Sequence, residues 1–81
     1  MKLRYHPRIA EQLADAPSSA RRAFELQIAL LAENLRHPSL RAKKYDEANG
    51  GWQARVTKGW RFYFRIEDDT YTILSVRAHP K

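Results

Sequence analysis

Arginine occupies several polar positions in the sequence GWQARVTKGWRFYFRI, residues 51–66. Apolar and polar residues alternate with a period of two in both halves of this segment, as in two half-buried strands that form a hairpin. Arg55 then lies on the polar side of the first strand, and Arg61 and Arg65 lie on that of the second. A guanidinium group can donate two parallel hydrogen bonds to phosphate or carboxylate oxygens. Arginines gathered on this polar side, called the open face below, can therefore bind such an anion.

The length of the hairpin loop sets the register of the two strands. A two-residue loop would place Arg55 on the same face as Phe62, against the pattern of both strands. A three-residue loop, Thr57–Gly59, avoids this conflict and places Gly59 in the left-handed conformation that such loops favour. Arg55 then lies directly opposite Arg61. The other predicted cross-strand pairs are Val56 with Trp60 and Ala54 with Phe62.

Placing Arg55 opposite Arg61 costs free energy. Like charges directly opposite each other destabilise an antiparallel pair by some tenths of a kcal/mol, up to about 1. This cost is understandable if an anion binds between the two side chains. In the alternative interpretation, both side chains extend into water without a ligand, and salt screens their repulsion.

A last apolar stretch, about residues 70–78, adds to the open face. Its alternation predicts a side toward the core that carries Thr72, Leu74, Val76 and Ala78. The other side carries Tyr71, Ile73, Ser75, Arg77 and His79. This register needs an odd-length turn or a bulge at Asp68–Asp69, because otherwise the two faces exchange. The open face then gathers hydrogen-bond donors around one histidine, a side chain that titrates near neutral pH: Arg55, Arg61, Tyr63, Arg65, Arg77 and His79.

Composition restricts the classes of ligand and partner. The 81 residues suffice for one small domain, residues 1–81, and the formal charge of +6 favours nucleic acid, an acidic protein segment or an anionic membrane as partner. A membrane is the weakest of these, because the sequence has no long apolar run and no signal peptide. The absence of cysteine and the scatter of three histidines offer no metal-site spacing. We therefore expect no metal, no cofactor and a cytoplasmic protein.

The first half of the chain predicts a short strand and two helices. Leu3–Tyr5 can form the strand, and His6-Pro7 starts a helix that runs to about Asp15. A second helix begins at Pro17-Ser18-Ser19 and ends at His37-Pro38. Residues 39–51 form a basic connection to the three strands described above. We predict an α+β domain of the order β-α-α-β-β-β, with two N-terminal helices packed on one face of a small, mainly antiparallel, twisted sheet.

The run WQARVTKGWRFYFRI, followed by ILSVRAH, resembles the RelE/ParE toxin superfamily of toxin–antitoxin systems. Within this superfamily it is most similar to the RelE and YoeB type of mRNA-cleaving toxins, and the order of elements agrees over almost the whole chain. The resemblance implies the toxin of a type II system, an endoribonuclease that cleaves mRNA on the ribosome without a metal ion. The implied partners are the ribosome, mRNA and a cognate antitoxin, for which the basic charge of this chain suggests an acidic segment.

By position, the resemblance implies catalytic roles for three residues. Arg61 corresponds to the family's central phosphate-stabilising arginine, Arg55 to a basic residue that faces the same phosphate, and His79 to the YoeB-type terminal histidine. The two arginines would stabilise the negative charge of five-coordinate phosphorus, and His79 would protonate the departing 5′-oxygen. Because Arg61 and His79 are expected on the open face, their removal is not expected to impair folding.

Two departures from the family pattern leave part of the site open. The YoeB type carries a glutamate general base at a place that corresponds to the neighbourhood of Ala42. The general base is therefore unassigned. The enzyme could rely on the geometry of the site alone, or Lys43, Lys44 or Glu47 could act as the base. The family also often has an aromatic residue after the terminal histidine, where this chain has Pro80.

Further contacts with RNA or the ribosome are predicted for Lys43, Lys44, Lys58, Tyr63, Arg65 and Arg77. Tyr45, Tyr63 and Tyr71 are candidates to stack on a base. Two other functions stay open: a ParE-like toxin that inhibits DNA gyrase by binding, and a basic module that binds RNA or an acidic protein. The presence of Arg61 together with His79 favours the nuclease, because binding alone does not require this pair.

Overall fold

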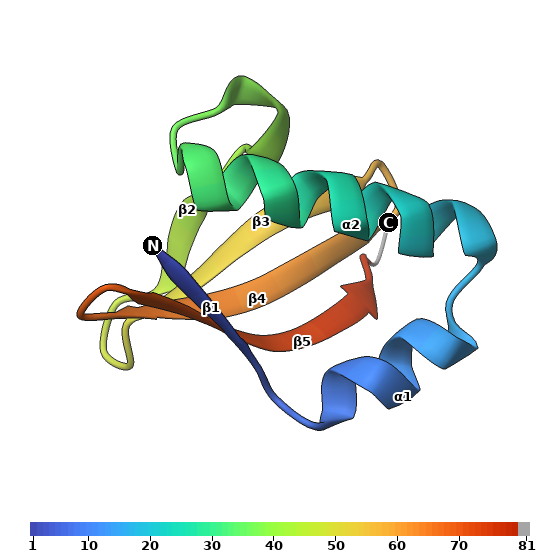
Figure 1. Cartoon of the computed structure of the whole chain (residues 1–81), viewed down its shortest axis with the longest axis horizontal. Coiled ribbons are helices and arrows are strands. Elements are labelled where there is room, and N and C mark those ends of the chain that lie inside the picture. Colours follow the sequence, from blue (N-terminus) through green and yellow to red (C-terminus); the bar gives the residue numbers. More distant parts are fainter. Residues whose placement is uncertain (80–81) are drawn as a thin grey trace.

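Five strands form one mixed sheet in the computed structural model, which describes residues 1–79 (Figure 1). The strands are β1 Lys2–Tyr5, β2 Lys43–Asp46, β3 Gly51–Thr57, β4 Trp60–Glu67 and β5 Thr70–Ala78. Their order across the sheet is β1-β5-β4-β3-β2, with β1 parallel to β5 and the other neighbours antiparallel. The predicted α+β class, the two helices and the mainly antiparallel sheet are confirmed.

Strand β2 lies within residues 39–51, where the sequence predicted only a connection. Its four residues, KKYD, show no alternation of apolar and polar side chains, which is the main signal for a strand. Backbone pairing with β3 holds it instead, with Lys43 opposite Gln53 and Lys44 opposite Trp52. Lysines on such an edge strand also discourage pairing with a further chain.

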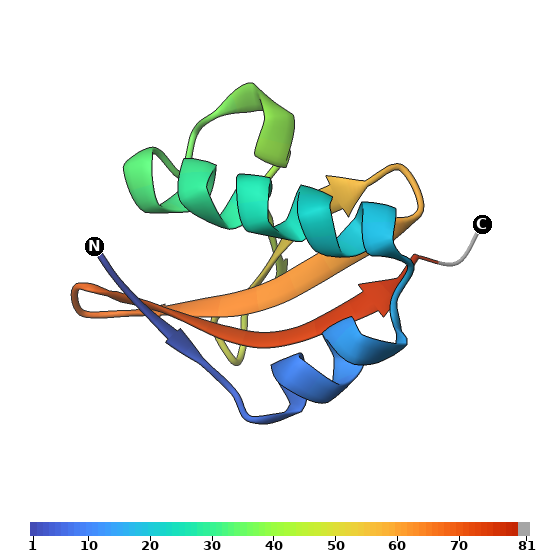
Figure 2. The same ribbon diagram turned by 45° about the vertical axis from the view of Figure 1, so that its right-hand side comes forward.

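Helix α2, Ser18–Glu33, lies across one face of the sheet and is followed by the short 3₁₀ helix η1, Pro38–Leu40 (Figure 1 and Figure 2). The sequence predicted that this helix continues to His37-Pro38, and that prediction is wrong. Asn34 already has an extended backbone, with φ −161° and ψ 105°. Its side-chain oxygen accepts a hydrogen bond from the amide of Arg36 at 2.9 Å. This local bond competes with the helix and ends it before the proline is reached.

Helix α1, Arg8–Asp15, packs beside β5 where β1 stops. Directly after β1, the amide of His6 donates a hydrogen bond to the carbonyl of Ile73 in β5 at 2.8 Å. Farther along β5, Oε1 of Gln12 accepts a hydrogen bond from the amide of Val76 at 2.7 Å. A side chain of α1 thus continues the hydrogen bonding of β1 along this edge.

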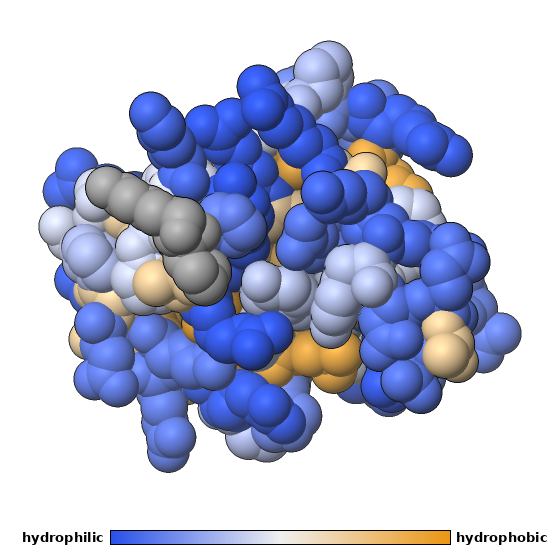
Figure 3. All heavy atoms as spheres, turned by 180° about the vertical axis from the view of Figure 1, so that it is seen from behind, coloured by the Kyte–Doolittle hydropathy of each residue, from blue (hydrophilic) through white to orange (hydrophobic). Residues whose placement is uncertain are grey.

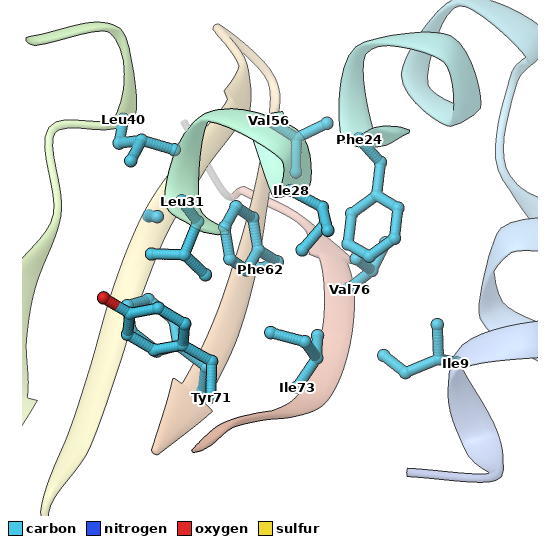
Figure 4. Close-up of a cluster of buried hydrophobic side chains, with 12 residues drawn as sticks. Ile9, Phe24, Ile28, Leu31, Leu40, Val56, Phe62, Tyr71, Ile73 and Val76 are labelled. Carbon is cyan, nitrogen blue, oxygen red and sulfur yellow. The ribbon is translucent and has the colours of Figure 1, made fainter. Parts of the chain in front are cut away.

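The core lies between α2 and the sheet, and Figure 4 shows most of its side chains. Phe62 and Phe64 are fully buried, with ring centroids 5.6 Å apart, and Phe24 of α2 packs edge-on against Phe62 at 5.7 Å. The buried cluster comprises Ile9, Phe24, Ile28, Leu31, Leu40, Ala54, Val56, Phe62, Phe64, Tyr71, Ile73 and Val76. The other side of the molecule carries mostly hydrophilic residues (Figure 3).

The hairpin of β3 and β4 has the predicted pairs Ala54 with Phe62 and Arg55 with Arg61. It reaches them differently from the prediction, because Trp60 pairs with Thr57 and the extra residue is a bulge in β3 between Arg55 and Thr57. The loop is therefore the two-residue turn Lys58-Gly59, and Gly59 does not have a positive φ. A bulge in the strand, like a longer loop, shifts the register by one residue and so places Arg55 and Arg61 on the same face.

The predicted register of β5 is right only in its last part. Glu67 pairs with Thr70 across the two-residue turn Asp68-Asp69, so Tyr71 and Ile73 face the core and are 4% and 0% exposed. A bulge at Leu74 then exchanges the faces, because Ile73 pairs with Phe64 and Ser75 with Tyr63. The predictions that Thr72 and Leu74 face the core, and Tyr71 and Ile73 the open face, are wrong. Beyond the bulge, Val76 is buried and Arg77 is exposed, as expected. Ala78, predicted on the core side, is exposed, and Ser75, predicted on the open side, is buried.

Candidate functional site

The three residues predicted to be catalytic line one pocket of about 220 Å³ on the open face. This arginine pocket is formed by Arg41, Lys43, Gln53, Arg55, Arg61 and His79. None of these described residues is acidic, so the described lining of the pocket carries positive charge without an acidic side chain. Such a site attracts a phosphate group or another anion.

The hairpin and the end of β5 together position the three residues. Arg55 and Arg61 face each other across β3 and β4, and both side chains are half-buried. His79 follows β5, and its backbone amide donates a hydrogen bond to the carbonyl of Gly59 at 2.7 Å. This bond ties the end of β5 to the hairpin turn and brings the imidazole to the two guanidinium groups.

Arg61 also stabilises the hairpin turn. Its Nη1 lies 2.7 Å from the carbonyl oxygen of Thr57, 3.0 Å from that of Trp60 and 3.2 Å from that of Lys58, and donates to all three. Within residues 1–79 the hydrogen bonds of this guanidinium all use Nη1, which leaves Nε and Nη2 for a ligand. Because these hydrogen bonds close the turn, we expect removal of Arg61 to lower the stability of the protein, in contrast to the expectation from the sequence.

Gln27 is a buried polar residue that fixes the backbone next to Arg55. It is 7% exposed, and its Nε2 donates to the carbonyls of Arg55 at 2.9 Å and Ser39 at 3.0 Å. Its Oε1 accepts from the hydroxyl of Ser39 at 3.1 Å. The amide thereby joins α2, η1 and β3. Its place on the apolar stripe of α2, between Phe24 and Leu31, was the sequence signal for a buried hydrogen-bonded side chain.

Arg41 and Gln53 also line the arginine pocket, although neither was predicted as a site residue. Arg41 ends η1 with φ 47° and ψ 42°, the left-handed conformation. Residues other than glycine rarely adopt this conformation, and it turns the chain from η1 toward β2. Gln53 belongs to β3 and lies opposite Lys43 of β2. Arg41 therefore depends on the turn into β2, a strand that has no signal in the sequence, whereas Gln53 shares the polar side of β3 with Arg55.

A second pocket on the open face, of about 390 Å³, contains the predicted RNA-binding residues Tyr63, Arg65 and Arg77. We call it the tyrosine pocket. Its lining residues are Arg8, Gln12, Tyr45, Tyr63, Arg65, Leu74, Ser75 and Arg77. The ring of Tyr63 lies 5.2 Å from that of Tyr45, nearly edge-on, and the guanidinium of Arg77 lies 4.3 Å from the centroid of Tyr63.

Other predicted residues lie elsewhere. The ammonium group of Lys44 lies 5.7 Å from the ring centroid of Trp52, and Lys58 is exposed in the hairpin turn, so neither lines these two pockets. Tyr71 is buried in the core and cannot stack on a base, which corrects that prediction. Of the candidate bases, Lys43 lines the arginine pocket, whereas Glu47 does not.

Three further observations concern metals, membranes and the end of the chain. In the part of the chain that the structure describes, no three His, Cys, Asp or Glu side chains are grouped to hold a metal ion. No helix within residues 1–79 has the length and apolar character needed to cross a membrane. Pro80, which departs from the family pattern, lies outside the described residues.

Comparison with known proteins gives structural matches. Neither a family model nor a curated protein matches the sequence. The YoeB/ParE toxin from Agrobacterium tumefaciens is 15% identical, with a TM-score of 0.80 over 99% of this chain and 100% of that chain. RelE in the RelE–RelB complex from Pyrococcus horikoshii is 17% identical, with a TM-score of 0.77 over 95% of this chain and 92% of that chain. The isolated E. coli RelE toxin is 14% identical, with a TM-score of 0.75 over 99% of this chain and 85% of that chain. The chain therefore has the fold of the RelE and YoeB/ParE toxins.

Proposed function

We propose that this protein is the toxin of a toxin–antitoxin pair and that it cleaves mRNA on the ribosome, in the cytoplasm, without a metal ion. The observation that carries the proposal is the meeting of Arg55, Arg61 and His79 in one pocket whose described lining residues include no Asp or Glu. The fold shared with RelE and YoeB/ParE toxins supports the same assignment.

The proposed chemistry uses the 2′-hydroxyl of the RNA as the nucleophile on the adjacent phosphate. Bidentate hydrogen bonds from Arg55 and Arg61 stabilise the additional negative charge of the five-coordinate phosphorus. His79 gives its proton to the 5′-oxygen that leaves. Lys43 in its neutral amine form is the candidate to receive the proton of the 2′-hydroxyl, because it is the side chain among the proposed bases that lines the pocket.

The test is expression of the protein in bacteria without an antitoxin, followed by mapping of mRNA 5′ ends. New 5′ ends within translated codons, absent from untranslated RNA and from cells that express an Arg55→Ala/His79→Ala variant, are the expected result. Intact mRNA would contradict the proposal. Intact mRNA together with loss of DNA supercoiling would instead assign the protein as a gyrase inhibitor.

An antitoxin with an acidic segment is the proposed protein partner. The solved structures that match this chain include complexes of RelE with RelB from Pyrococcus horikoshii and Methanococcus jannaschii. The charge of +6 and the open arginine pocket favour a negatively charged segment that covers Arg55 and Arg61.

A further inference from the structure

The tyrosine pocket is built around an aromatic pair that a glycine makes possible. Tyr45 lies at the irregularity in the pairing of β2 with β3, between Lys44 and Asp46. A Cβ atom at Gly51 would lie 2.9 Å from Cε1 of Tyr45 and 3.1 Å from Cβ of Asp46. The missing side chain therefore lets Tyr45 lie across β3 and reach Tyr63. Although it is held in this way, Tyr45 remains 50% exposed, so part of its ring is available to a ligand.

The charged groups of the tyrosine pocket are all arginines. Arg8, Arg65 and Arg77 line it, and none of its described lining residues is acidic. The guanidinium of Arg77 stacks on Tyr63, and Nε of Arg8 lies 3.0 Å from Nδ1 of His6. The one ion pair found within residues 1–79 joins Lys2 to Asp69, away from this pocket. Positioned arginines without carboxylate partners favour an anionic ligand.

The two pockets are neighbours on the same face of the sheet. Tyr63 follows Arg61 by two residues on β4, a spacing of about 7 Å along a strand. Gln53 of the arginine pocket pairs with Tyr63, and Arg61 pairs with Arg77. A single chain of nucleotides can therefore lie across both pockets, with a phosphate in the first and the next nucleotide in the second.

The combination of exposed tyrosine and arginine favours RNA over an acidic peptide. Bases stack on tyrosine rings and on guanidinium planes, while the sugar–phosphate chain binds arginine. Aspartate and glutamate would use the arginines and leave the aromatic pair without a contact. The volume of about 390 Å³ lies in the range of pockets that take small ligands.

We propose that the tyrosine pocket binds one nucleotide of single-stranded RNA, next to the nucleotide whose phosphate lies in the arginine pocket. Tyr45 and Tyr63 provide the stacking surface, and Arg65 and Arg77 bind the phosphate. The inference rests on RNA as the ligand of the proposed function, but it does not require that the RNA is cleaved.

The test is equilibrium binding of a short fluorescent single-stranded oligoribonucleotide to the purified full chain. Tyr45→Ala should weaken binding about tenfold, as loss of one stacked base does. Tyr5→Ala is the matched control, because Tyr5 is 46% exposed and lies outside both pockets. Arg77→Ala should lower the slope of log affinity against log salt by about 0.7, the value for one phosphate contact on a single strand. Arg22→Ala, which removes the same charge from an exposed position on α2, should leave the slope unchanged.

The outcomes separate this inference from the proposed cleavage. The inference is overturned if Tyr45→Ala weakens RNA binding no more than Tyr5→Ala does. The same holds if Tyr45→Ala weakens only the binding of an acidic peptide, because the pocket then serves a protein partner. If Tyr45→Ala weakens RNA binding while the wild-type protein leaves cellular mRNA intact, the inference stands and the cleavage proposal fails. Should Tyr45→Ala not fold, as judged by its melting curve, the salt slopes of Arg77→Ala and Arg22→Ala decide.

Discussion

Arg61 combines a role in the arginine pocket with a role in the hairpin turn. Arg61→Ala removes the three hydrogen bonds to the turn carbonyls, and this destabilises the protein. Removal of the like-charge pair with Arg55 offsets part of the lost stability. A net loss of about 1 kcal/mol would lower the melting temperature by about 4–8 °C in a domain of this size. We also expect the single-turnover cleavage rate on ribosomes to fall by about a hundredfold or more, as when one oxyanion donor is removed.

Cleavage and melting of Arg61→Ala are measured on the same preparation. An unchanged melting temperature would show that the turn does not depend on this side chain. Cleavage at the wild-type rate would remove Arg61 from the site.

His79 offers a contrast, because its imidazole is exposed and makes no hydrogen bond to another residue of the described chain. His79→Ala should therefore melt as the wild type does, while the cleavage rate falls strongly. If His79 is the general acid, its removal should also flatten the dependence of the cleavage rate on pH. A pH profile of the same shape in both proteins would assign proton donation to another group.

Gln27 acts on the site through the backbone of Arg55. Gln27→Leu keeps the size of the side chain but removes the hydrogen bonds to Arg55 and Ser39, so we expect a loss of about 2 kcal/mol in the free energy of unfolding. Urea denaturation measures this loss. Leu26→Ala is the control, because Leu26 is 69% exposed on the same helix and should change stability by less than about 0.5 kcal/mol. Equal stability of the two variants would contradict the role of Gln27.

At the level of elements, substitution of alanine for each of two glycines should change the stability of the protein in opposite directions. Gly51→Ala places a methyl group against Tyr45 and Asp46, and such crowding costs about 1–3 kcal/mol. Gly59→Ala meets nothing within 4 Å and needs no positive φ, so it should stabilise the protein by about 0.4–1 kcal/mol through the unfolded state. Thermal melting of both variants tests the pair. A stable Gly51→Ala protein would show that Tyr45 moves aside without cost.

The elements also show where prediction from the sequence succeeds. Arg55 was correctly placed opposite Arg61. The apolar alternation of both strands requires the two arginines to share the polar face, and either a longer loop or a bulge can produce this register. In β5, the stretch YTILSV presents apolar residues in both phases, so alternation alone could not locate the bulge at Leu74. Strand β2 has no apolar pattern, and its backbone pairing brings Lys43 to the site. Arg41 joins the site through tertiary contacts, which a local pattern does not contain. Gln53 shares the polar side of β3 with Arg55, and Gln27 lies on the apolar stripe of α2, so the sequence holds a local signal for both.

Over the whole molecule, a charge of +6 and one ion pair within residues 1–79 leave most of the positive charge unpaired. Association with an acidic antitoxin should therefore be fast at low salt and slow steeply as ionic strength rises. Stopped-flow binding over a series of salt concentrations measures this dependence. A salt-independent association rate, or a purified complex that leaves Arg55 and Arg61 exposed to solvent, would contradict neutralisation by charge.

The pairing of β1 with β5 fixes the order in which the protein can be completed during its own synthesis. β1 emerges from the ribosome before every other strand, and its neighbour in the sheet, β5, emerges after them. Contacts between such distant segments form late, because the intervening chain must first be closed into a loop. α1 also packs on β5, and His79 follows β5 in the chain. The packing of α1 and the arginine pocket can therefore form only after β5 has been synthesised. A nascent chain therefore lacks the complete pocket until β5 has left the ribosome.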